Sequence, residues 1–69
     1  MYRADLIRER RQALGVRPEA LATAIGRSTA SLYLYETGAV IPPIPVLEDI
    51  ADGLNMSIGD FFEGDEVAA

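Results

Sequence analysis

The sequence predicts an all-α domain in which five short helices surround one small core. Three observations lead to this prediction. Gly15, Gly26 and Gly38 follow apolar-periodic segments at the positions where helices end. Leu47, Ile50, Ala51 and Leu54 repeat at the i, i+3, i+4, i+7 spacing of one helix face. A chain of 69 residues has room for a single modest core.

The first two helices are predicted from apolar stripes and end signals. A helix over about 3–14 would bury the stripe Leu6, Ile7, Ala13 and Leu14. A second helix would start at Pro18, because proline suits the first helical position, and would end at Gly26. Its inward residues are expected to be Leu21, Ala22 and Ile25.

The third helix is predicted over residues 28–36, with Ser28 as its N-cap and Gly38 as its stop. Leu32 and Tyr35 are spaced i, i+3 and would form the buried stripe, which turns Tyr33 and Leu34 towards the other face.

The remaining chain is predicted to form a proline-stiffened loop over 39–45, a fourth helix over 46–54 and a short fifth helix. Ser57 and Asp60 have the spacing of a capping box at the start of the fifth helix, and Phe61 and Phe62 would anchor it. We therefore expect one domain over 1–62, followed by an acidic, disordered tail over 63–69.

Charge is distributed unevenly along a chain whose net charge is −5. All six basic residues are arginines within residues 1–27, where Asp5, Glu9 and Glu19 are the only acids, so this part has a charge of +3. Residues 28–69 contain eight acids and no base. The positive charge therefore belongs to the first two helices and the turn after them.

Several function classes are excluded by residues that the chain lacks. Without cysteine or histidine it has no thiolate or imidazole ligand and no histidine base, so we expect no enzyme, no cofactor and no metal site. No apolar run approaches the roughly 18 residues that span a bilayer, and the N-terminus is polar. We expect a cytoplasmic protein with no membrane contact.

The second helix, the Gly26 turn and the third helix have the spacing of a helix-turn-helix, in which small Ala22 permits a close crossing. Over residues 3–62 the chain resembles the Cro and phage-repressor family, that is, the lambda-repressor-like DNA-binding domains. The resemblance rests on DLIRERRQALGV, PEALATAIG, the stretch STASLYLYETG with its closing Glu-x-Gly, Pro42, and LEDIADGLNMSIGDFF.

This resemblance implies a transcription regulator whose third helix enters the major groove of double-stranded DNA. It implies a structural ion pair between Arg11 and Glu36. Base edges would be read by Thr29, Ala30, Tyr33 and Leu34, whereas Ser28, Ser31, Arg17 and Arg27 would meet phosphates. The full DNA-binding set is Arg17, Arg27, Ser28, Thr29, Ala30, Ser31, Tyr33, Leu34 and Thr37.

Two questions stay open from the sequence. A homodimer with recognition helices about 34 Å apart fits the leading hypothesis. The apolar loop and the last two helices could form its contact, or Val40, Ile41 and Ile44 could instead cover the fourth helix. The alternative function is a protein-binding module, antirepressor- or antitoxin-like, that uses the Tyr33/Leu34 face or the 39–45 loop, which the acidic balance would suit.

Overall fold

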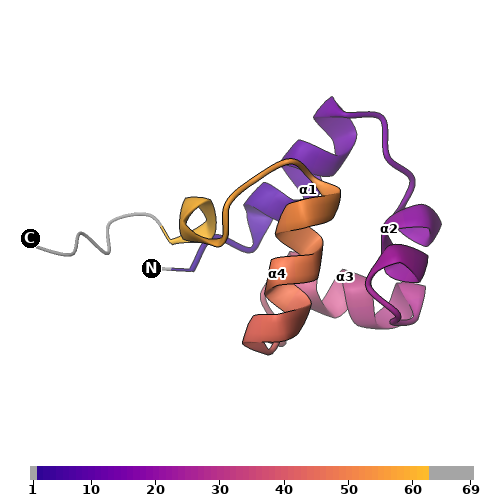
Figure 1. The fold of residues 1–69 in the computed structure, drawn as a ribbon. Coiled ribbons are helices and arrows are strands. Elements are labelled where there is room, and N and C mark those ends of the chain that lie inside the picture. Colours follow the sequence, from indigo (N-terminus) through magenta and orange to yellow (C-terminus); the bar gives the residue numbers. More distant parts are fainter. Residues whose placement is uncertain (1, 63–69) are drawn as a thin grey trace, which may run out of the picture.

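Four α-helices and one turn of 3₁₀ helix make up the computed structural model, which describes residues 2–62 (Figure 1). The elements are α1 (Asp5–Ala13), α2 (Pro18–Ala24), α3 (Thr29–Thr37), α4 (Ile44–Gly53) and the 3₁₀ turn η1 (Ile58–Phe61). The all-α prediction is therefore confirmed, but the fifth predicted helix is only a 3₁₀ turn. The expected tail over 63–69 lies outside the described residues.

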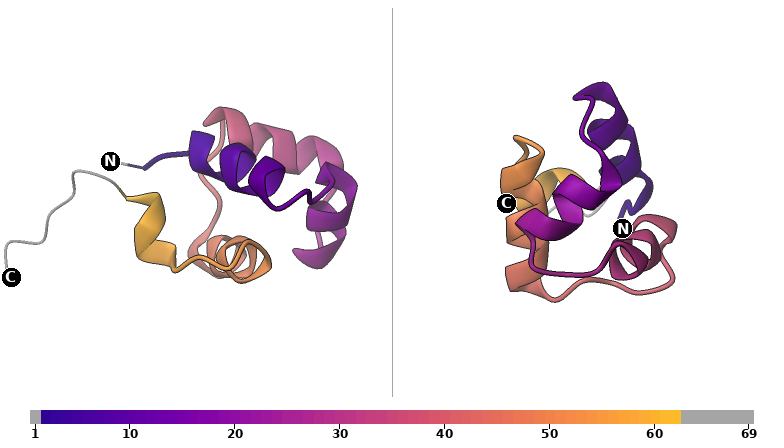
Figure 2. Two further views of the ribbon diagram at one scale, coloured as in Figure 1. Left: turned by 90° about the horizontal axis from the view of Figure 1, so that it is seen from above. Right: turned by 90° about the vertical axis from the view of Figure 1, so that its right-hand side faces the viewer.

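The helices pack so that α3 has one face against the body of the domain. α2 and α3 cross at a steep angle and contact each other extensively, while α1 also packs on α3 and α4 packs on α2 (Figure 1). Seen from above, α1 lies alongside α3, and α4 is viewed end-on below them (Figure 2). None of the described helices is long and apolar enough to cross a membrane.

The core is apolar and draws on every helix. The inward residues predicted for the second, third and fourth helices are all buried. The buried apolar set is Ile7, Leu21, Ala22, Ile25, Leu32, Tyr35, Val46, Leu47, Ile50, Ala51, Leu54 and Phe61. Burial of such side chains contributes roughly 1.5–3 kcal/mol for each of the larger ones, which makes this core the main source of stability.

The stripe predicted for the first helix is only partly correct. Ile7 is buried and Leu6 is half-buried, but Ala13 is exposed and Leu14 is 40% exposed. Arg11, one helical turn after Ile7, occupies the inward position instead. The physical reason is that Arg11 has a buried carboxylate partner on α3, which apolar periodicity in one helix cannot reveal.

The turn between α2 and α3 depends on two small residues. Gly26 has a φ of 70°, in the left-handed region that side chains disfavour. Ala22 is 2% exposed at the helix crossing, where a larger side chain would push the helices apart. Gly26 permits the tight turn and Ala22 permits the close crossing of α2 and α3, so these two residues account for the predicted helix-turn-helix geometry.

The fourth helix begins earlier than predicted, at Ile44. Pro43 is its N-cap and Pro45 lies in its first turn, where a missing N–H costs nothing. Ile41 and Ile44 are 65% and 57% exposed, and Val40 is exposed as well. The alternative in which these three residues cover the core is therefore wrong; Pro42 and Val46 are the buried residues of this segment.

The two ends of the described chain are joined beside η1. Arg3 N–H donates to the Phe61 carbonyl at 2.7 Å, and Tyr2 pairs with Phe62 in an isolated β-bridge. Phe61 is fully buried, whereas Phe62 is 36% exposed and packs its ring on Tyr2, so only Phe61 anchors the turn as predicted. Burial raises the pKa of Tyr2 to about 12.

A buried ion pair joins α1 to α3. Arg11 Nε lies 2.9 Å from Glu36 Oε2, and the Arg11 Nη2 donates to Glu36 Oε1 at 3.4 Å. Arg11 Nη1 also donates to the Val16 carbonyl at 3.1 Å. Both side chains are buried, so each charge depends on the other for its stabilisation.

Removing one member of this pair should destabilise the domain strongly. We expect Glu36→Gln to lower the free energy of unfolding by about 3 kcal/mol or more, because Arg11 would remain buried without a countercharge. The double variant Arg11→Met/Glu36→Leu should recover most of that loss, since it leaves no buried charge. Urea denaturation measures both values. A Glu36→Gln variant within about 0.5 kcal/mol of the parent would contradict this account.

Candidate nucleic-acid interface

The outer face of α3 is exposed and contains the predicted base-reading residues. Ala30 is exposed, Tyr33 and Leu34 are each 47% exposed, and Thr29 is half-buried. Leu32, Tyr35 and Glu36 occupy the opposite face, which is buried. The structure therefore brings these four residues together on one surface, as the helical period requires.

Ser28 is the N-cap of α3. Its Oγ accepts the Ser31 N–H at 3.1 Å, and the two hydroxyl oxygens are also hydrogen-bonded at 3.1 Å. Leu32, the next residue along the helix, donates its N–H to the Ser28 carbonyl. The N–H groups of Thr29 and Ala30 have no acceptor among the described residues, so they are available to an anion at this end of the helix.

Thr37, at the far end of α3, is engaged locally. Its Oγ1 donates to the Leu34 carbonyl at 3.2 Å and accepts the Ala39 N–H at 3.4 Å. The hydroxyl hydrogen is therefore directed into the helix end. Thr37 is exposed and adjoins the α3 surface, but its donor is already in use.

Three of the six arginines stabilise the fold. Arg3 pairs with Asp5 at 2.7 Å, and this hydrogen-bonded contact lowers the pKa of Asp5 to about 2. Arg10 Nε donates to the Leu54 carbonyl at the end of α4, and Arg11 pairs with Glu36. The Arg10 contact satisfies a carbonyl at the C-terminal end of α4, and its positive charge complements the dipole of that helix.

The other three arginines, Arg8, Arg17 and Arg27, are exposed and make no ion pair with another described residue. Arg17 is the N-cap of α2, and Arg27 directly precedes the Ser28 cap of α3. The sequence predicted Arg17 and Arg27 as phosphate contacts. It did not predict Arg8, because the position of Arg8 beside α3 depends on how α1 packs against α3.

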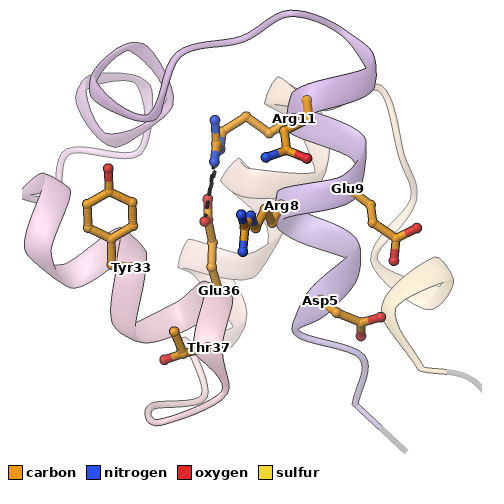
Figure 3. Close-up of a pocket in the computed structure, with 8 residues that line it drawn as sticks. Asp5, Arg8, Glu9, Arg11, Tyr33, Glu36 and Thr37 are labelled. Carbon is orange, nitrogen blue, oxygen red and sulfur yellow. Dashed lines mark hydrogen bonds and ion pairs between the residues drawn. The ribbon is translucent and has the colours of Figure 1, made fainter.

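A polar groove lies between α1 and α3 (Figure 3). Its volume is about 730 Å³, and it is lined by Asp5, Arg8, Glu9, Arg11, Gln12, Tyr33, Glu36 and Thr37. In the close-up, the Arg8 side chain extends from α1 towards Glu36, whereas Asp5 and Glu9 point to the opposite side of α1. The groove therefore adjoins the exposed face of α3 through Tyr33 and Thr37.

The exposed surface of α4 is acidic. Glu48, Asp49 and Asp52 are all exposed, and no basic residue follows Arg27 in the sequence. Among the described residues there is no cluster of three ligands suited to a metal ion. These three carboxylates would repel a polyanion from this face of α4.

Two solved structures show close similarity in fold. The P22 c2 repressor protein, solved in complex with the synthetic operator 9T in the presence of Tl⁺, superposes with a TM-score of 0.84 and 26% identity, over 94% of this chain and 98% of that one. A chain of the SinR–SinI complex superposes with a TM-score of 0.79 and 21% identity, over 96% of this chain and 65% of that one. At 21% identity, this second match shows similarity of fold only. No curated protein matches the sequence.

The family model described as "Helix-turn-helix domain" matches residues 4–60. This match includes all four α-helices and most of η1. The chain belongs to the helix-turn-helix domain family, and its architecture is that of the Cro and lambda-repressor type.

Proposed function

We propose that this protein is a transcription regulator that binds double-stranded DNA sequence-specifically, as a homodimer with α3 in the major groove. The observation that supports this best is the arrangement around α3. Its outer face is exposed and uncharged. Arg17 and Arg27, which make no ion pair within the described part of the chain, lie at the starts of α2 and α3. Phosphates met at that corner would fix α3 in register while its side chains contact bases.

Few cations are available, which favours a dimer. Binding to DNA depends strongly on the number of phosphates that a protein neutralises. One subunit offers too few unpaired arginines for tight binding, and two subunits double the number. Val40, Ile41 and Ile44 are apolar, exposed and follow α3 in the sequence, and these three residues are our candidates for the contact between subunits.

The base contacts proposed for α3 are mainly apolar. Between residues 28 and 37 the helix has no arginine, lysine, asparagine or glutamine, which are the side chains that form bidentate hydrogen bonds with bases. Its outer face includes exposed Ala30 and Leu34 and half-buried Thr29, all of which have methyl groups. The apolar feature that the major groove offers is the C5-methyl of thymine, so we propose that this methyl group dominates recognition.

A second candidate function is protein binding through the same uncharged surface. Residues 28–47 contain one charged residue, Glu36, and that residue is buried and paired. A surface without exposed charge from α3 to the start of α4 would also suit an apolar protein partner, at the Tyr33/Leu34 face or the 39–45 loop.

Selection from random duplex DNA at two salt concentrations tests the leading proposal. We expect a two-fold-symmetric site to be enriched, with affinity that falls as salt rises. Arg17→Gln and Arg27→Gln should each reduce the log–log salt slope of the dimer by about 1.8, that is, about 0.9 per phosphate in each subunit. Glu48→Gln on α4 is the matched control and should leave the preferred site unchanged. No enrichment at low salt would refute DNA binding and favour a protein partner.

Methyl recognition is tested by base analogues in the selected site. Replacing a contacted thymine by uracil removes only the C5-methyl and should weaken binding about fivefold or more, in line with roughly 1 kcal/mol for a lost base contact. Placing 5-methylcytosine in a cytosine position next to Ala30 or Leu34 should not weaken binding. Equal affinities for the thymine and uracil sites would show that α3 reads some other feature.

A further inference from the structure

We infer that the groove between α1 and α3 binds a phosphate of the DNA backbone, and that Arg8 is the residue that binds it. This inference rests on the proposed function. It assigns a phosphate contact to α1, outside the helix-turn-helix itself, near the last turn of α3.

The first step is the position of Arg8. Arg8 is exposed on α1 and makes no ion pair with another described residue. Its side chain reaches from α1 into the groove, towards the last turn of α3 (Figure 3). Arg27, in contrast, precedes the first turn of α3. The two cations therefore lie near opposite ends of a helix about 13 Å long, at 1.5 Å per residue.

The second step concerns the acids that border the groove. Glu36 is buried and held by Arg11, so its charge is balanced. Asp5 is held by Arg3, and both Asp5 and Glu9 point to the far side of α1 (Figure 3). Glu9 also lines the groove and makes no ion pair with another described residue, but its side chain points away from α3 (Figure 3). On the side that faces α3, the charge without an ion-pair partner among the described residues is Arg8. Gln12, which also lines the groove, adds a neutral hydrogen-bond donor.

The third step is the geometry of the major groove. It is about 12 Å wide, close to the 10–12 Å diameter of a helix with its side chains. A helix inserted there has a row of phosphates along each flank. Because Tyr33 and Thr37 belong both to the exposed part of α3 and to the rim of this groove, a duplex in contact with α3 would bring a phosphate to Arg8.

The test is a salt titration of Arg8→Gln on the selected DNA site. If Arg8 binds one phosphate in each subunit, the salt slope of the dimer should fall by about 1.8. Over a fourfold rise in salt, the parent protein should then lose about twelvefold more affinity than the variant, since each contact accounts for a factor of about 3.5. Arg8→Lys retains the charge and should restore the slope. Thermal unfolding should be nearly unchanged in both variants, because Arg8 makes no ion pair with any residue of 2–62, the part that the structure describes.

A scan of the site with neutral methylphosphonate linkages locates the contact. The parent should lose affinity at one linkage to which Arg8→Gln is insensitive, and this linkage should differ from those that respond to Arg17→Gln and Arg27→Gln. An unchanged slope for Arg8→Gln, with DNA binding by the parent intact, would overturn the groove assignment alone. Absence of DNA binding by the parent would instead overturn the proposed function.

Discussion

The ion pair between Arg11 and Glu36 is the constraint on which the rest of the structure depends. Both charges are buried, so the loss of either partner would leave the other buried without a countercharge, which is strongly destabilising. The pair fixes the last turn of α3 against α1, while Ala22 and Gly26 fix its first turn against α2. With both ends held, Thr29, Ala30, Tyr33 and Leu34 have one direction in which to point. The exposed face of α3 is thus a consequence of what lies on its buried face.

The arginines fall into two groups, three that are held by contacts within the fold and three that make no ion pair with another described residue. Arg3, Arg10 and Arg11 are held by a carboxylate, a helix-end carbonyl and the buried pair, respectively. The exposed acids of α4 lie on a different element from Arg8, Arg17 and Arg27, which adjoin α2 and α3. Net charge describes solubility and long-range repulsion, whereas binding depends on where unpaired charge is placed. A chain with a net charge of −5 can therefore still have exposed arginines on elements other than the acidic α4, as the proposed DNA binding requires.

The fold was largely predictable because its determinants are local. Glycine turns, the Ser28 cap and helical periodicity predicted α2, α3 and the buried face of α4. The errors have long-range causes. Arg11 is buried because its carboxylate partner lies on α3, and α4 starts at Ile44 because prolines that are typical of loops also fit the first turn of a helix. For the site, the period of α3 predicted that Tyr33 and Leu34 face outward, and the family resemblance added Thr29 and Ala30. Arg8 could not be predicted, since only the packing of α1 on α3 places it there.

The central claim, that a buried pair presents α3 to duplex DNA, is tested most directly by mapping backbone amide chemical shifts as a duplex is added at low salt. The account predicts shifts concentrated in residues 27–38 and around Arg17 and Arg8, with residues 48–52 of α4 unaffected. Shifts centred on α4 or confined to the 39–45 loop would contradict it, as would the absence of any shift.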